Sequence, residues 1–554
     1  MSASTPTRTL ALVLLAAAIA LGLSAPADAA SPTEATQAYP VLEVTQEGLT
    51  SRQAAALSSS LRPVLGKGAA VTDAESAWRY YSPTSLVSGY AFGAPLPKRG
   101  GDDERGPSQK SGSWNLPLLA KADTGAMQAA AAAFGKATAA LPLGEVRALA
   151  RTSPMRLQVA NPVTAALTFD RQIGATVGLD LTAAGLQVIG PGAQVGAMVG
   201  PDAKVAFAHL NVHALKSSGE TASVPTGSAA STACASAISN GKPVSYRATP
   251  VYYVPSPAPK GSRIRPVLLC IPTVNGQELE GLVLLDPSNV QLPPPIGAGG
   301  VRIPEDPVGS TRFGTAYLGA NAQPPLDVPQ PDGSVIPFNG LNTEGLAKSL
   351  MYWGERTLAL ADNLPTNVLA GGATALADSV DLMWVATHGR PDGWQSDNGG
   401  LIEMRSVRLG AKDLEWLVSF ACRVLFETGV DGAPWQVRLP GMFQGMHQLL
   451  GYGSVVLTSE KSGRVFANAA RLPMDVFGTG LLPREVNTFP ISLAWAISAI
   501  ETQPTHVRLS ENWQYDTQWA VVGTQNLAYD CLDCRQGDEI PGPNVSLWRL
   551  TGGA

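Results

Sequence analysis

Two stretches of unbroken apolar residues constrain the fold of this chain more than any other feature. Residues 378–389 (DSVDLMWVATHG) and 414–425 (LEWLVSFACRVL) each contain a continuous apolar run rather than an alternating one. Such a run predicts a strand that is covered on both faces, as in a parallel sheet. Residues 341–363, 463–477 and 491–501 favour helices before and after these strands. The pattern predicts an α/β fold whose mostly parallel sheet is flanked by helices in the C-terminal half.

The rest of the chain divides into segments of different composition. With 554 residues, the chain is long enough for two or three domains. Residues 1–30 combine an early arginine, an apolar stretch and a small-residue cleavage site, which predicts a signal peptide rather than a membrane anchor. We expect a mixed, partly helical region over residues 31–150. The short β-branched runs of residues 151–290 predict a strand-rich α+β module.

A linker is expected between this module and the α/β domain. Residues 291–308 are rich in proline and glycine, which stiffen a chain and interrupt regular structure. The α/β domain is expected over residues 309–530, and a C-terminal tail with a C-x-x-C pair over residues 531–554. Both apolar runs therefore fall in one predicted domain.

Charge and hydropathy argue against two kinds of partner. The net charge is -5 and the sequence has no basic cluster, so nucleic-acid binding has no support. After the first thirty residues, no apolar segment is long enough to cross a bilayer. We therefore expect a secreted or periplasmic protein that has no membrane association after signal removal.

The five cysteines are informative because exported proteins form disulfides. Cys234 and Cys270 lie in one region and are candidates for a bridge. Cys531 and Cys534 are candidates for a disulfide that fixes the tail, with a redox role as the alternative. Cys422 remains, and we interpret it as a candidate reactive thiol, against the alternative of a small buried apolar residue.

A histidine and a cysteine follow the two apolar runs. His388 and Cys422 fall at the carboxyl ends of the predicted strands, where α/β sheets bind ligands. Strands of a sheet lie roughly 5 Å apart, so the two side chains are expected within reach if the strands are neighbours. Histidine can take the proton of a thiol. The backbone N–H groups of Gly389 and Cys422 are candidates for stabilising an oxyanion.

The order of these motifs resembles a known group of enzymes. The sequence VATHG, followed by VSFACRVL, is similar to the caspase-like cysteine peptidases, which include caspases, legumains, gingipains, separases and the CHAT peptidases. The resemblance covers roughly residues 375–505 and implies His388 as general base, Cys422 as nucleophile and Gly389 as oxyanion donor. It also implies a peptide or protein substrate and no cofactor. A bacterial domain family of unknown function has a similar layout.

We therefore expect an exported cysteine endopeptidase, and two alternatives stay open. One is a non-catalytic exported binding protein that keeps the caspase-like sheet as a scaffold. The other is an acyl-transfer enzyme, such as a transpeptidase, with the same pair of residues. A buried Cys422 that faces away from His388 would favour the scaffold.

Further residues of this region are candidates for lining the site. Residues 441–454 indicate a helix followed by a turn, and His447 on it could line the site or bind a metal, with packing as the alternative. A metal usually needs at least three well-placed ligands, and the spacing here does not predict them. The acidic candidates for a specificity pocket are Asp392, Asp413, Glu415 and Glu460.

Overall fold

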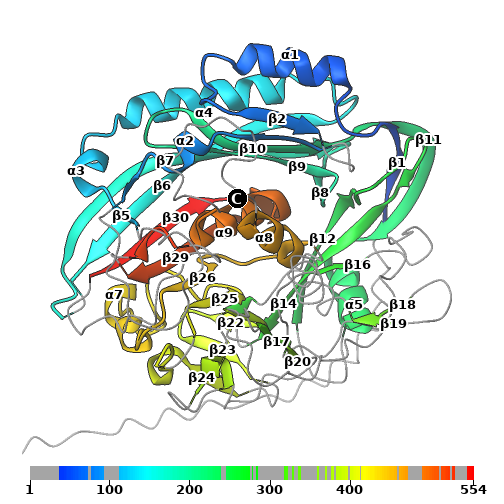
Figure 1. Cartoon of the computed structure of the whole chain (residues 1–554). Coiled ribbons are helices and arrows are strands. Elements are labelled where there is room, and N and C mark those ends of the chain that lie inside the picture. The colour runs from blue at the N-terminus through cyan, green and yellow to red at the C-terminus, as the bar shows by residue number, and fades with distance from the viewer. Residues whose placement is uncertain are drawn as a thin grey trace, which may run out of the picture.

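The computed structural model describes most of the N-terminal half and the strands and helices at the core of the C-terminal half (Figure 1). The expected signal peptide (1–30), the linker (291–308), Cys531 and Cys534 lie outside the described part. The described residues are 36–72, 77–92, 112–161, 163–238, 245–274, 277–278, 282–284, 317–321, 327–329, 335–337, 358–360, 369–370, 376–379, 382–396, 400–411, 414–457, 461–471, 489–510, 513–524, 527–530 and 546–554.

Six antiparallel strands of the described part, of which β6 and β7 are the longest, form a layer in the N-terminal half (Figure 1). Their order is β2–β3–β10–β9–β7–β6, and each neighbouring pair is antiparallel. The strands are β2 (Ala69–Thr72), β3 (Trp78–Tyr81), β6 (Arg147–Ala160), β7 (Leu167–Ala183), β9 (Ala193–Val199) and β10 (Val205–Val212).

Two helices, α1 (Ser51–Leu61) and α4 (Thr124–Ala139), cover the outer face of this layer (Figure 1). The side chains of Thr50 and Asp123 accept backbone N–H groups at the first turns of α1 and α4, which satisfies donors that a helix start leaves open. Phe134 of α4 is fully buried against the strands in a shared apolar cluster. Both helices lie within residues 31–150, where the sequence predicts a partly helical region.

The sheet continues into a second group of strands that a disulfide stabilises. Strand β8 (Leu186–Ile189) of the first group pairs in parallel with β12 (Ser245–Tyr253). Strand β12 in turn lies antiparallel to β14 (Pro266–Val274). Helix α5 (Gly227–Ile238) packs beside these strands. Cys234 of α5 and Cys270 of β14 form a disulfide, as the sequence predicts.

Parallel strands occur in the C-terminal half. Their order is β20–β17–β21–β25–β26, and all four neighbouring pairs are parallel. Strands β29 (Gln518–Thr524) and β30 (Leu547–Gly553) continue the sheet in antiparallel pairing, and β30 pairs with β6. One sheet therefore connects both halves. The parallel strands are β17 (Tyr317–Asn321), β20 (Leu358–Leu360), β21 (Leu382–Ala386), β25 (Trp416–Phe420) and β26 (Gln448–Tyr452).

The fold is mixed α/β, and the expectation of a mostly parallel sheet is only partly right. The large sheet is mostly antiparallel, with few parallel pairs in its C-terminal part. Antiparallel β29 and β30 are buried along almost their whole length, as the parallel strands β21 and β25 are. A continuous apolar run reports burial on both faces, so it does not determine strand direction.

Helix α9 (Ile491–Thr502) lies in the middle of the molecule beside α8 (Ser462–Arg471), between the N-terminal and C-terminal strands (Figure 1). Every residue from Ile491 to Glu501 is buried. A helix that is apolar on all sides needs such complete burial. Both helices are predicted by the sequence, and α9 contacts strands of both halves.

The helix predicted over residues 441–454 is wrong. A short 3-10 turn, Pro440–Met442, is followed by strand β26, which pairs with β25 and β29. Gly441 and Gly445 interrupt the helical pattern, and pairing on both edges fixes the apolar run that follows as a strand.

No helix of the described part is long and apolar enough to cross a membrane. The remaining elements of the structure are short or lie at its margins. These elements are β1 (Thr36–Gln46), α2 (Pro83–Leu86), β4 (Tyr90–Phe92), β5 (Gly112–Trp114), α3 (Leu116–Leu119), β11 (Ala214–Pro225), β13 (Arg263–Ile264), β15 (Gln277–Glu278), β16 (Leu282–Leu284), β18 (Asp327–Pro329), β19 (Val335–Pro337), β22 (Gly389–Arg390), β23 (Gly393–Gln395), β24 (Leu401–Glu403), α7 (Trp435–Arg438), β27 (His506–Ser510) and β28 (Trp513–Asp516).

Candidate active site

Strands β21 and β25 are parallel neighbours, and His388 and Cys422 follow them in the same register. The pairing ends with Ala386 opposite Phe420. The N–H of Thr387 then donates to the Phe420 carbonyl at 3.3 Å. His388 and Cys422 are each two residues beyond the last pair, so both segments leave the sheet at its carboxyl edge.

Gly389 lies directly against the cysteine segment. A Cβ atom at this position would be 2.6 Å from the carbonyl oxygen of Cys422, 2.6 Å from Val424 and 2.8 Å from Ala421. Contacts this short leave no room for a side chain. The histidine-bearing turn can therefore approach the Cys422 backbone this closely only with glycine at position 389.

The thiol of Cys422 is covered. The residue is fully buried in an apolar cluster beneath α8 and α9, and its sulfur accepts the N–H of Val456 at 3.4 Å. The next residue, Arg423, has φ 58°, which is uncommon for a residue other than glycine. Strained backbone of this kind is frequent where a side chain must be aimed at a functional site.

The segment Val455–Leu457 covers Cys422 and is held by Gln503. The fully buried amide of Gln503 accepts the Leu457 N–H and donates to the Leu457 carbonyl, both at 2.9 Å. Gln503 follows the end of α9, so the central helix fixes the cover over the thiol.

His388 is partly exposed, and its backbone is fixed. Its carbonyl accepts the Gln395 N–H at 2.9 Å, and the Thr387 hydroxyl donates to the Gln395 carbonyl at 2.8 Å. Burial lowers the pKa of His388 from 6.5 to about 4, because the charged form loses solvation. The imidazole is therefore neutral near pH 7 and can accept a proton.

His447 is not brought together with His388 and Cys422. It precedes β26 and packs edge-on to Trp416 at the start of β25, whereas Cys422 follows the end of that strand. His447 lies 2.9 Å from a carboxylate oxygen of Asp530, which also accepts the Trp416 indole N–H at 2.7 Å. Asp530 is fully buried. Because it lies 83 residues after His447 in the chain, no local sequence pattern predicts that the two side chains meet.

Asp392 lines a polar cavity of about 220 Å³ that also contains Arg438. Its carboxylate accepts the Val430 N–H at 3.2 Å. Glu415 directly precedes β25, and its carbonyl accepts the His447 N–H. Asp413 and Glu460 fall outside the described residues.

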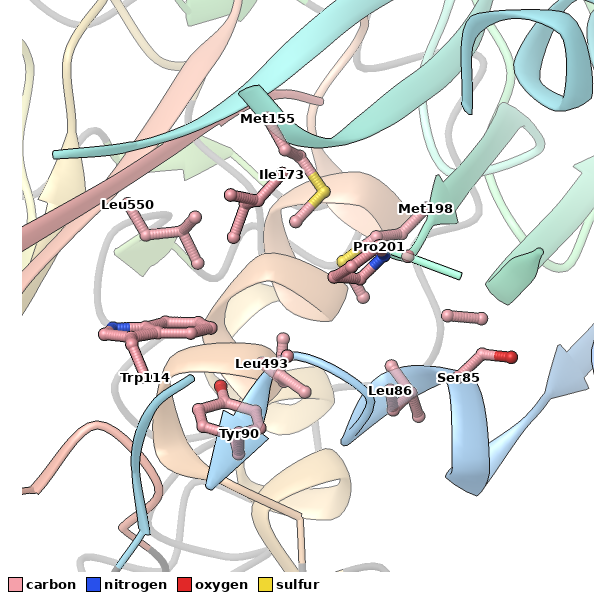
Figure 2. A pocket seen from close by; sticks show the side chains of 13 residues that line it. Ser85, Leu86, Tyr90, Trp114, Met155, Ile173, Met198, Pro201, Leu493 and Leu550 are labelled. Carbon is pink, nitrogen blue, oxygen red and sulfur yellow. The ribbon is translucent and has the colours of Figure 1, made fainter. Parts of the chain in front are cut away.

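A second, apolar pocket lies between α9 and the strands around it. Figure 2 shows Met155, Ile173 and Leu550 on one side and Tyr90 on the other, with Leu493 of α9 among them. Its free volume is about 20 Å³, which is room for about one water molecule. The pocket is a small packing defect around the central helix.

Metal binding has no support in the described part of the chain. No three histidine, cysteine, aspartate or glutamate side chains gather there in positions that could hold a metal ion. Of the cysteines described, Cys422 alone is not part of a disulfide.

The sequence of the C-terminal region matches a known family. Residues 339–548 match DUF6345, a domain of unknown function. The DUF6345 region holds His388 and Cys422, together with β21, β25, β26 and α9. The match supports an uncharacterised domain and identifies no caspase-like family. None of the curated proteins compared with the chain matches it.

Proposed function

We propose that the chain is an exported cysteine peptidase in which Cys422 attacks the peptide carbonyl and His388 transfers protons. The observation that carries the proposal is the register of β21 and β25, which leaves the two residues at equivalent positions of one sheet edge. The close approach of Gly389 to the Cys422 backbone and the strained Arg423 support it.

Each proton has a place in the proposed reaction. His388 takes the thiol proton as the sulfur bonds to the peptide carbonyl carbon, and the carbonyl oxygen becomes an oxyanion. The N–H groups of Gly389 and Cys422 are the proposed donors to that oxygen. The C–N bond then breaks, and the amine leaves with the proton from His388.

Hydrolysis of the thioester completes the cycle. His388 takes a proton from water as the water oxygen attacks the acyl carbon. The C–S bond breaks, the acid product leaves and the sulfur regains its proton. If an amine replaces the water, the same residues catalyse acyl transfer, so product analysis distinguishes a transpeptidase from a peptidase.

Substrate access requires movement of the cover. Val455–Leu457 and the Val456 N–H occupy the space around the sulfur, so this structure corresponds to a closed form of the proposed enzyme. Export is supported by the disulfide between Cys234 and Cys270, because such bonds persist in oxidising compartments.

A second candidate function is non-catalytic binding on the same scaffold. The specific observation in its favour is the complete burial of Cys422. Free cysteine is among the most buried residue types and often acts as a small apolar side chain.

The test is peptide cleavage by the mature chain. A proteome-derived peptide mixture is incubated with the wild type and with Cys422→Ala, and new termini are identified by mass spectrometry. We expect cleavage that is lost in Cys422→Ala. Cleavage that persists in the variant, or no cleavage by a folded wild type, would reject the peptidase and favour the scaffold.

A further inference from the structure

The cavity of about 220 Å³ near the His388 turn has an unusual lining. Three arginines and three acidic residues face it, and two of them, Arg390 and Asp392, follow Gly389 closely in the chain. Arg405 and Asp431 pair with each other at 2.7 Å at the exposed rim. The other charged lining residues are Arg390, Asp392, Glu403 and Arg438.

Arg438 is the buried member of this set. Only 2% of its surface is exposed. Its amino groups donate to the carbonyls of Pro391 and Phe426, its Nε–H has no hydrogen-bond partner, and it forms no ion pair with a described carboxylate. Burial lowers the pKa of Arg438. A buried guanidinium with an unused donor favours a carboxylate ligand strongly.

The charge balance of the cavity disfavours a divalent anion more than a monovalent one. Three positive and three negative side chains cancel formally. A carboxylate that contacts Arg438 brings one negative charge, and its attraction to Arg438 outweighs its repulsion by Asp392 and Glu403. A phosphate, with nearly two charges near neutral pH, would be repelled more by these acids.

Exposed apolar side chains lie in the chain segment 426–437, which precedes Arg438. Phe426, Val430 and Val437 are 41%, 60% and 53% exposed, and they are three of the seven exposed large apolar residues of the described part. Phe426 contributes a carbonyl to Arg438, and Val430 contributes its N–H to Asp392. Apolar surface beside a charged pocket is typical of ligand sites.

We infer that this cavity is a carboxylate-binding site in which Arg438 is the anchor. The ligand is either a small free acid or an acidic side chain of a peptide, which share the same group. The inference does not depend on the reactivity of Cys422, because it rests on the lining and the unsatisfied donor alone.

Titration calorimetry on the full chain after signal removal tests the site. The probes are N-acetyl-aspartate amide, its neutral counterpart N-acetyl-asparagine amide, the monocarboxylate propionate, and inorganic phosphate. We expect the aspartate derivative to bind and the asparagine derivative not to bind. Binding of propionate alone would assign the site to a free acid, and binding of the aspartate derivative would assign it to an acidic side chain.

Two buried arginines allow a matched comparison. Arg549 is 4% exposed, donates to the carbonyl of Leu425 and also has an unpartnered Nε–H, but it does not line the cavity. We expect Arg438→Lys to weaken carboxylate binding by about tenfold or more, because lysine lacks the planar fork. Arg549→Lys should leave the Kd unchanged.

A third variant tests the charge argument if Arg438→Lys fails to fold. Asp392→Asn removes a nearby negative charge, so carboxylate binding should become tighter. The inference is wrong if neither acid binds, if the asparagine derivative or phosphate binds as tightly as the acids, or if Asp392→Asn weakens binding. Equal losses in Arg438→Lys and Arg549→Lys would also overturn it.

Discussion

At the scale of single residues, the approach of two backbone segments depends on one missing side chain. Gly389, the residue after His388, lies against the carbonyl of Cys422, where any side chain would collide with it. The sequence suggests the turn, and the His-Gly and Ala-Cys motifs place both segments at one sheet edge. The cover over the sulfur is not predictable, because Val456 and Gln503 reach it from distant parts of the chain.

Gly389→Ala should destabilise the protein. The new Cβ would lie within 3 Å of the Cys422 carbonyl oxygen, Val424 and Ala421, so backbone must shift at a cost of about 1–3 kcal/mol. Urea unfolding measures the loss. Gly125→Ala is the control, because its Cβ would meet only the movable Asp123 side chain and should be neutral or stabilising. An equally stable Gly389→Ala would contradict the close approach.

Stability should fall as the pH decreases from 6.5 towards about 4. Burial lowers the pKa of His388 and of His213 from 6.5 to about 4. Between these values the unfolded histidines bind protons that the folded ones do not, so acid favours unfolding. For the almost fully buried His213 the loss is on the order of 3 kcal/mol by pH 4.

The measurement is the free energy of unfolding in urea as a function of pH. His213→Gln and His388→Gln should each reduce the slope between these two pH values. A wild-type profile that is flat in this window would show that the two imidazoles are solvated in the folded state.

At the scale of elements, three segments meet around the candidate nucleophile: β21, β25 and Val455–Leu457. The first two are predictable from local patterns, since their apolar runs are continuous and end in polar residues. Local patterns of the same kind wrongly predict a helix at strand β26. Its identity depends on pairing with β25 and β29, and local periodicity contains no such partner information.

Gln503→Ala should expose the thiol. Its side chain makes two hydrogen bonds to Leu457, each contributing about 1 kcal/mol. Loosening the cover should raise the alkylation rate of Cys422 about tenfold or more, read by mass spectrometry. Gln448→Ala is the control, because this buried glutamine holds the Leu527 carbonyl instead. Equal acceleration in both variants would indicate general loosening.

At the scale of the whole molecule, α9 joins the two halves. Strand β30 completes the connection by pairing with β29 and β6. The buried character of α9 is predictable from its composition, which is apolar on all sides. Its partners are not, because they come from strands hundreds of residues away, and the same holds for the ion pair between Arg79 and Glu501.

Glu501→Gln should destabilise the contact between the halves. Arg79 donates to both carboxylate oxygens of Glu501, at 2.9 and 2.8 Å, and His209 lies 3.6 Å from one of them. Although burial opposes its charge, Arg79 and His209 lower the pKa of Glu501. Removing the charge leaves Arg79 uncompensated, at a cost of about 3 kcal/mol.

Thermal and urea unfolding of Glu501→Gln measure this cost. Asp170→Asn is the matched control, because Asp170 pairs with Arg156 at the surface, where the side chains are 26% and 50% exposed, and should cost much less. Similar losses in both variants would show that the α9 pair is no more important than a surface pair.

Alkylation of Cys422 by iodoacetamide tests whether His388 activates the Cys422 thiol. The rate is measured by mass spectrometry at about pH 5 to 9 for wild type and His388→Ala, because thiol reactivity depends on removal of the proton. We expect wild-type Cys422 to react near neutral pH and His388→Ala to abolish this reactivity. An inert Cys422, or equal rates with and without His388, would contradict it.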